Sequence, residues 1–236
     1  MELDEISLYR ILDGSAFLGS GGGGMISSGK TFIKEIVSSG KKVQLITEDM
    51  LEEKGDLLSC IVCDIGSITA FDPNQSGALK LAFEMLGVHF EDLGKIEALF
   101  PIETGPENTL AAFVLAAYYG IPVIDGDGAG RAVPTIPLCT FSVLNVPHWK
   151  PVCIANGSGD SMLVFTSEKE KFDTLLRSVA NLEAFQKSGS LALWPDKVKN
   201  LFSKCIPGTI TNALFVGQIL EGIREGNKGL VSKSLQ

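Results

Sequence analysis

The chain has 236 residues, 45% of them hydrophobic and 20% charged, and this balance is typical of a globular protein with its own core rather than of a disordered chain. Its formal net charge is −8 and its largest basic cluster is the pair Lys41-Lys42, which argues against binding to a nucleic-acid backbone. The longest apolar stretch, residues 110–124, is broken by Gly120 and Pro122 and falls short of the roughly 20 residues that cross a bilayer. We therefore expect neither a nucleic acid nor a membrane as a partner.

The amino terminus and the cysteines predict a cytoplasmic location. The opening residues MELDEISLYR are acidic and lack the basic start and apolar run of a secretory signal. Five cysteines at irregular spacings do not make a disulfide framework, so we expect them to be reduced residues of the core.

Apolar periodicity in the first half predicts alternating helices and strands. Helices are expected at residues 6–12, 32–37, 79–86 and 107–119, and strands at residues 43–47, 57–65, 96–102 and 121–124. The strand at 57–65 is almost entirely apolar, as expected for a strand that is covered on both faces. This alternation predicts an α/β fold with a mainly parallel sheet flanked by helices.

The pattern changes after Pro134, in the second half of the chain. Strands are expected at residues 136–145 and 151–165, the latter a hairpin that turns at residues 156–160, and helices at residues 172–179 and 210–223. We expect a small antiparallel layer in this half. The whole chain, residues 1–236, is then one domain, and a subdivision into a parallel α/β part at residues 1–135 and a part with antiparallel strands and helices at residues 136–236 is left open.

The segment Gly19-Ser-Gly-Gly-Gly-Gly24 is the most conspicuous motif, because consecutive glycines allow a sharp turn or a close approach of the backbone to a ligand. Three interpretations are open. The segment fits the dinucleotide pattern G-x-G-x-x-G, although residues 15–18 are short for the strand that must precede it. Residues 24–31 fit the phosphate-binding pattern G-x-x-x-x-G-K-[ST], with Asp64 as the acid that closes an apolar strand. The third interpretation is a tight turn packed under a neighbouring strand.

Three segments in order along the chain resemble the S-methyl thiohydantoin desulfurase family, which is found with hydantoinase and oxoprolinase-type proteins. They are Gly19–Gly24, Pro101-Ile-Glu103 with Asn108, and the run Pro122-Val-Ile-Asp125-Gly-Asp127-Gly-Ala-Gly130-Arg131-Ala-Val-Pro134. The resemblance implies hydrolytic removal of a sulfur substituent from a hydantoin-like ring. This chain departs from the family pattern at Thr135, where an acid is usual, at Thr104, where the family has the first glycine of a pair, and in the absence of the usual β-rich second half.

The first candidate catalytic group is Asp125, Asp127 and Arg131. The two aspartates follow the apolar run 121–124, and the carboxyl end of a strand is where open α/β sheets bind ligands. Either carboxylate is then a candidate base, and both are candidate ligands of a divalent metal. Arg131 is a candidate cation for an imide oxygen or an oxyanion. The alternative is a turn in which both aspartates accept hydrogen bonds from backbone N–H groups.

Glu103 and Asn108 form a second candidate group, after the strand predicted at residues 96–102. Glu103 is a candidate general base, or else an acid near the positive end of the following helix. Asn108 is a candidate substrate ligand or a helix cap. The backbone N–H groups of Gly21, Gly22, Gly23 and Gly24 are candidate donors to a substrate carbonyl.

The favoured function is a hydrolase-like protein that acts on or binds a hydantoin-like ring. A non-catalytic binding module of the same family and a nucleotide hydrolase are the alternatives. The expected partner is a small molecule, and a divalent metal, a second copy of the chain and a separate carboxyl-terminal half are left open as further partners.

Overall fold

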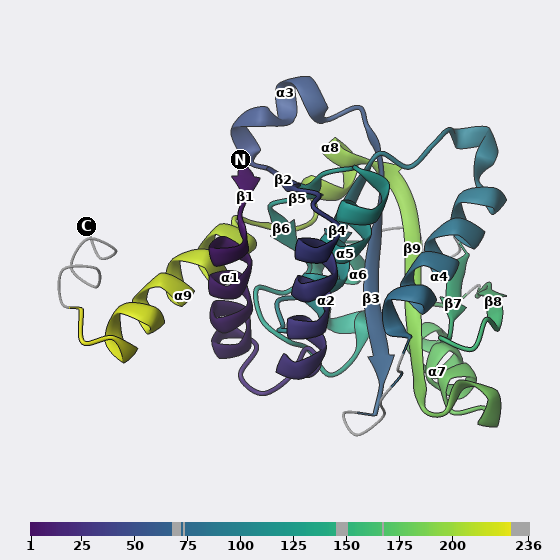
Figure 1. Ribbon diagram of the computed structural model, residues 1–236. Helices are drawn as coiled ribbons and strands as arrows, with labels where there is room; N and C mark the ends of the chain where they lie inside the picture. Colours follow the sequence, from purple (N-terminus) through teal and green to yellow (C-terminus); the bar gives the residue numbers. More distant parts are fainter. Residues whose placement is uncertain (68–71, 73, 145–150, 167, 228–236) are drawn as a thin grey trace.

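The computed structural model describes residues 1–67, 72, 74–144, 151–166 and 168–227, and its centre is an eight-stranded sheet (Figure 1). The strand order is β1-β2-β5-β4-β3-β9-β7-β8. The strands are β1 (Glu2–Leu3), β2 (Val43–Ile46), β3 (Leu58–Gly66), β4 (Ala98–Pro101), β5 (Val123–Ile124), β7 (Val152–Ala155), β8 (Ser161–Val164) and β9 (Ser188–Lys197).

The sheet is parallel at its centre and antiparallel toward both edges. Strands β2, β5, β4 and β3 run parallel, and β1 pairs antiparallel with β2. Beyond β3, the strands β9, β7 and β8 continue the sheet in antiparallel pairing. A second sheet pairs β6 (Gly126–Asp127) with β10 (Ile206–Pro207). The predicted α/β fold is confirmed, and the antiparallel strands of the predicted hairpin extend the main sheet.

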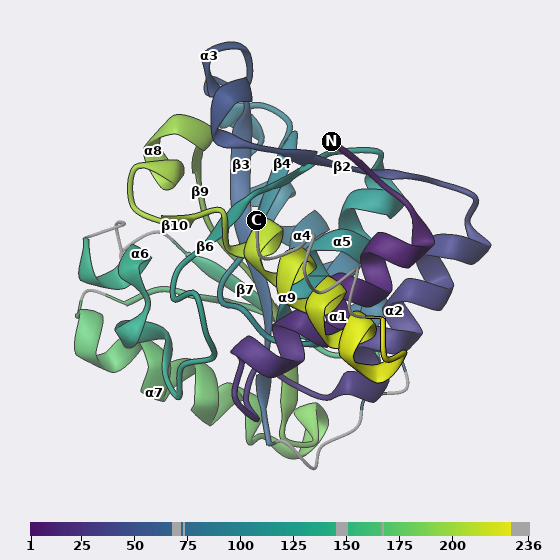
Figure 2. The same cartoon turned by 90° about the vertical axis from the view of Figure 1, so that its left-hand side faces the viewer.

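Helices cover both faces of the main sheet (Figures 1 and 2). One face carries α1 (Glu5–Leu18), α2 (Ile26–Ser38), α4 (Gln75–His89) and α5 (Asn108–Tyr119), and the other carries α6 (Thr140–Val143), α7 (Lys169–Ala180) and α8 (Val198–Phe202). Strand β3 serves both cores because successive side chains point to opposite faces: Cys60 and Val62 join the first core, and Ile61 and Cys63 the second. No helix in the described part of the chain is both long and apolar enough to cross a membrane.

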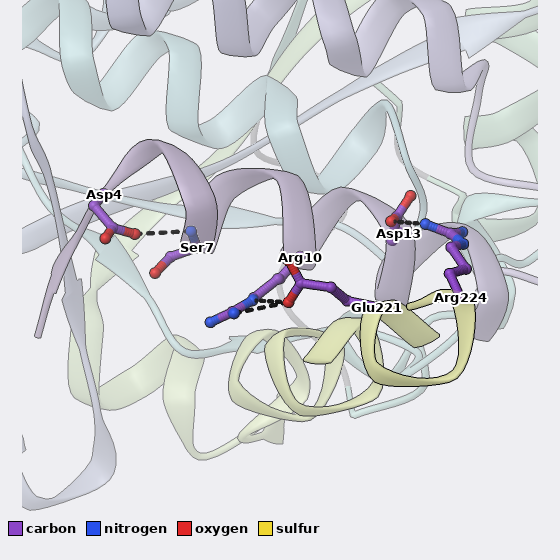
Figure 3. Close-up of polar contacts among 6 residues, drawn as sticks. All are labelled: Asp4, Ser7, Arg10, Asp13, Glu221 and Arg224. Carbon is purple, nitrogen blue, oxygen red and sulfur yellow. Dashed lines mark hydrogen bonds and ion pairs between the residues drawn. The ribbon is translucent and has the colours of Figure 1, made fainter. Parts of the chain in front are cut away.

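The last described helix, α9 (Thr209–Arg224), packs closely against α1. A Cβ atom added to Gly217 would lie 1.9 Å from the carbonyl oxygen of Arg10, and one added to Gly14 would lie 1.8 Å from that of Ala213. Two ion pairs, Arg10 with Glu221 and Asp13 with Arg224, join the same two helices (Figure 3). Asp4 caps α1 by accepting a hydrogen bond from the Ser7 N–H group at 2.8 Å. Glycine therefore allows the helix backbones to approach each other at this crossing.

The predicted strand at residues 136–145 is wrong for its described part. Residues Ile136–Leu138 form a 3₁₀ turn and α6 follows, while residue 145 lies outside the described residues. Pro137 offers no N–H group to a strand ladder, and the Thr140 N–H group donates to the Gly128 carbonyl. This segment therefore packs against the turn that follows β6.

Strand β9 was not predicted, because its sequence SGSLALWPDK contains residues that are rare in central strands. The strand accommodates Pro195 at an irregularity in its pairing with β3, where the register shifts between Ser59 and Ile61. Trp194, beside the proline, has a φ of +51°. The register shift tolerates a proline that an unbroken ladder would exclude.

Candidate functional site

A pocket of about 260 Å³ opens where the parallel strands β3 and β4 end. Its wall is built from the glycine loop, the start of α2, the ends of the two strands, the start of α5 and the start of β9. Residues 133–136 and Arg177 of α7 complete it. The carboxyl ends of parallel strands are the ligand-binding edge of open α/β sheets, so this position is typical of a functional site.

The glycine loop lies against the amino-terminal end of α5. The Gly23 carbonyl accepts hydrogen bonds from the N–H groups of Glu107 and Asn108, at 3.0 and 3.1 Å. Gly23 and Gly24 have φ values of +74° and +87°, and a Cβ on Gly23 would lie 2.4 Å from the Cα of Gly105. Only glycine fits here without strain. Among the described residues no acceptor is found for the Gly23 and Gly24 N–H groups, and both residues line the pocket.

Two of the candidate site residues, Glu103 and Asn108, are buried together in the pocket wall. The Asn108 Nδ2 group donates to Glu103 Oε1 at 2.7 Å, and the Val133 N–H group donates to Glu103 Oε2 at 2.6 Å. Burial raises the pKa of Glu103 above its usual range, and the nearby charge of Asp127 adds to this, although the two hydrogen bonds oppose the shift. A carboxyl group with a raised pKa is suited to exchanging protons near neutral pH.

A further acidic pair in the pocket, Asp64 and Glu107, was not among the predicted site residues. The Ser190 hydroxyl donates to Asp64 Oδ1, and the Asp64 N–H group donates to Asn108 Oδ1 at 2.7 Å. Glu107 accepts from the Met25 N–H group at 2.9 Å and from Gln75 Nε2 at 2.6 Å. The signal that singled out Asp125, an acid at the end of an apolar strand, applies equally to Asp64, which the sequence analysis considered only as part of a phosphate-binding loop.

Asp125 and Asp127 lie outside the residues that line the pocket. Asp125 Oδ1 accepts from the N–H groups of Ile210 and Thr211, at 3.0 and 3.1 Å, and thereby caps α9. Asp127 accepts from Thr104 Oγ1 at 2.5 Å and from the N–H groups of residues 129 and 130. These contacts match the structural alternative, in which the aspartates satisfy backbone donors.

Arg131 is exposed and also lies outside the pocket lining, as does Gly21, whereas Gly22, Gly23 and Gly24 belong to it. The cation that lines the pocket is Arg177. Its Nε donates to Asp173 at 2.6 Å and its guanidinium also donates to the Pro134 carbonyl at 2.6 Å. Arg177 could not be found from the motifs, because it lies on an amphipathic helix whose charged residues look like an ordinary solvated face.

The oxygens of Asp125 and Asp127 do not fit the role of metal ligands, because N–H and O–H donors already occupy them. Within the described residues, no group of three or more His, Cys, Asp or Glu side chains is placed to hold a metal ion. The described part of the chain therefore supplies no set of ligands for the divalent metal that the sequence left open.

The nucleotide-binding interpretations both require a strand directly before the glycine-rich segment. Residues 15–18 are instead the last turn of α1, and Lys30 is exposed on α2. Neither a dinucleotide-binding loop nor a phosphate-binding loop has its structural context here.

Comparisons with known proteins place this chain in a family. The chain resembles a crystal structure of a protein from Chromobacterium violaceum, solved by the Northeast Structural Genomics Consortium, with a TM-score of 0.80 and 26% sequence identity. The match covers 96% of this chain and 62% of that one, so this chain spans less than two thirds of its structural relative. A search of curated proteins found no match. Residues 6–166 match the family model described as "S-Me-THD-like, N-terminal domain", and the chain therefore belongs to the S-Me-THD-like family through its N-terminal domain.

Proposed function

We propose that this chain binds a hydantoin-like ring in the pocket at the ends of β3 and β4 and hydrolyses a sulfur substituent from it. The observation that carries the proposal is the placement, around one small cavity, of buried carboxyl groups and of backbone N–H groups that have no acceptor among the described residues. Membership of the S-Me-THD-like family supports the same substrate class.

The chemistry of the pocket complements such a ring. A hydantoin alternates N–H donors with carbonyl acceptors, and the pocket offers carboxyl oxygens for the first and the Gly23 and Gly24 N–H groups for the second. Its volume of about 260 Å³ lies just below the roughly 300 to 1,000 Å³ of pockets for drug-sized ligands, which favours a single small ring.

In the proposed reaction, Glu103 acts as the general base. It takes a proton from water while the water oxygen attacks the ring carbon that carries the S-methyl group. The glycine N–H groups stabilise negative charge on the ring carbonyl. The carbon–sulfur bond then breaks, and methanethiolate leaves with a proton as methanethiol, so that a carbonyl group replaces the S-methyl group. Arg177 takes the charge-stabilising role first considered for Arg131, and Asp125 and Asp127 are left with structural roles.

The substitution Glu103→Gln tests this role. Wild-type protein should bind hydantoin in calorimetry and release methanethiol from S-methyl thiohydantoin, followed by the methyl signal in proton NMR. Glu103→Gln should slow release by about 100-fold or more, because general base catalysis contributes about that much. The exposed Glu97→Gln is the matched control and should leave the rate unchanged. A melting temperature recorded for each variant separates lost chemistry from lost folding, and a wild-type chain that binds neither compound would refute the proposal.

A second candidate is a binding module without turnover. The hydrogen bonds that both oxygens of Glu103 accept, from Asn108 and Val133, favour it, because a carboxyl group that is already satisfied by the protein is less ready to take a proton from water. Hydantoin binding in calorimetry, with no methanethiol released at any pH between 5 and 9, would support this candidate over the hydrolase.

A further inference from the structure

Asp64 stands at the end of β3 with one carboxyl oxygen satisfied and the other unpaired. The Ser190 hydroxyl of β9 donates to Oδ1, and Asn108 fixes the backbone of Asp64 by accepting from its N–H group. Oδ2 is buried and has no hydrogen-bond partner among the described residues, although Asp64 lines the pocket. A buried, unpaired oxygen is costly for an ionised carboxylate, so the arrangement favours a proton on Oδ2 and a partner for that proton.

Two of the groups that face Asp64 also disfavour its charge. They are Glu107 before α5 and Asp72 before α4, both acids that line the pocket, whereas Ser190 of β9 and Gln75 of α4 act in the opposite sense and favour the charged form. Glu107 accepts hydrogen bonds on both oxygens, from Met25 and Gln75, which is the pattern of a carboxylate. Burial, and next the charge of Glu107, raise the pKa of Asp64 well above its usual range.

We propose that Asp64 works as a neutral carboxylic acid whose buried Oδ2–H donates to the bound ligand. This inference rests on the proposed function and narrows its substrate class. The ligand must present an acceptor to Asp64, either a carbonyl oxygen or an imine-type ring nitrogen, and an anionic group is disfavoured beside Glu107.

For an S-methyl thiohydantoin, the acceptor is the ring nitrogen that is double-bonded to the carbon carrying sulfur. Water adds to that carbon, Glu103 takes one water proton, and the π electrons move to the nitrogen, which takes the Asp64 proton. The hydroxyl oxygen then forms the carbonyl as the carbon–sulfur bond breaks. Methanethiolate takes the proton from Glu103, and the hydroxyl proton returns to Asp64. Both residues regain their starting forms, and water plus the S-methyl compound has become the carbonyl compound plus methanethiol.

The protonation state is tested without any ligand, which keeps this test independent of the proposed function. The ¹³C NMR signal of the Asp64 carboxyl carbon is followed, and it is assigned as the signal that disappears in Asp64→Asn. The signal should be that of a protonated acid at pH 6, and Glu107→Gln should lower its titration midpoint. The exposed Asp92→Asn should leave that midpoint unchanged. An Asp64 that is ionised at pH 6 would overturn the proposal even if hydantoin binds.

The donor role is tested with hydantoin in calorimetry and with S-methyl thiohydantoin in the NMR assay. Asp64→Asn retains an N–H donor and no acidic proton, so it should bind hydantoin within about threefold of wild type and lose at least 100-fold in rate. Asp64→Ala should lose at least tenfold in affinity. Wild-type affinity should fall as the pH rises through the midpoint of Asp64. Equal affinities for Asp64→Ala and wild type would contradict the donor role. If wild type binds no hydantoin, the proposed function is refuted, and the NMR titration alone then decides whether Asp64 is protonated.

Discussion

At the scale of single residues, the position of a charged side chain decides its role more than its motif does. Arg131 belongs to a conspicuous motif and yet is exposed, whereas Arg177 belongs to none and lines the pocket. Asp125 follows one apolar strand and Asp64 lies near the end of another, but donors from α9 take up the oxygens of Asp125, while one oxygen of Asp64 has no partner among the described residues. The two aspartates differ in their hydrogen bonds because different segments of the chain pack beside them.

The two arginines provide a test of this distinction. Arg177→Ala should weaken hydantoin binding by about 1 to 3 kcal/mol, because a charge-assisted contact at the pocket is removed. Arg131→Ala should change the affinity by less than twofold, because its side chain lies outside the lining. Isothermal calorimetry on both variants measures the difference. Equal losses in the two variants, or a loss confined to Arg131→Ala, would contradict the assignment of the pocket cation.

At the scale of elements, the contact between α1 and α9 depends on glycine. Gly14 and Gly217 leave no room for a Cβ, and the ion pairs of Arg10 and Asp13 lie on the same pair of helices (Figure 3). The amino-terminal end of α9 is in turn held by Asp125. The helix is therefore fixed both along its length and at its start.

Alanine substitution at two helical glycines tests this crossing. Gly217→Ala should lower the free energy of unfolding by about 1 to 3 kcal/mol, since its new methyl group would overlap the Arg10 carbonyl. Gly87→Ala, in α4, is the matched control because a Cβ there meets nothing within 4 Å. This control should be neutral or stabilise the protein by up to about 1 kcal/mol through helix propensity. Urea unfolding followed by circular dichroism measures both; a neutral Gly217→Ala would show that the helices do not require this close approach.

The elements that the sequence predicts correctly are those whose local pattern agrees with their environment. The apolar run of β3 and the continuous apolar stretch of α5 need no knowledge of distant residues, and Glu103 and Asn108 are candidates because they flank this kind of strand and helix. Strand β9 could not be predicted because Pro195 is tolerated only through a register shift against β3. Asp64 and Arg177 enter the pocket through long-range packing, which apolar periodicity does not encode. The roles of all these residues in binding stay predictions.

At the scale of the whole molecule, buried acids make stability depend on pH. Burial raises the pKa values of Asp64, Glu103 and Asp127 in the folded state above their usual range. Between the usual and the raised values, the folded state binds more protons than the unfolded state, so these groups reduce stability as the pH rises. Each unit of pKa shift corresponds to about 1.4 kcal/mol.

The substitution Asp64→Asn should remove one such contribution. The variant should gain free energy of unfolding relative to wild type at pH 7.5, and the gain should shrink as the pH falls toward 4.5, because the cost of keeping the folded carboxyl group protonated falls as the pH approaches the usual pKa of an aspartate. Urea titrations at pH 4.5, 6.0 and 7.5 measure the difference. The exposed Asp92→Asn serves as the control and should differ from wild type by the same amount at every pH; a gain for Asp64→Asn that does not vary with pH would show that Asp64 is not protonated in the folded protein.

The insertion of β9 between β3 and β7 has a consequence for the order in which the protein matures. Ser190 reaches Asp64 across 126 positions of the chain, and Arg177 and Ser188 come from the same late segment. A ribosome that has made residues 6–166 has therefore produced the glycine loop, Glu103 and Asn108, but not a closed pocket. Contacts between such distant residues form slowly, because a long loop must be closed first. The pocket is therefore complete only after β9 has been synthesised and paired with β3.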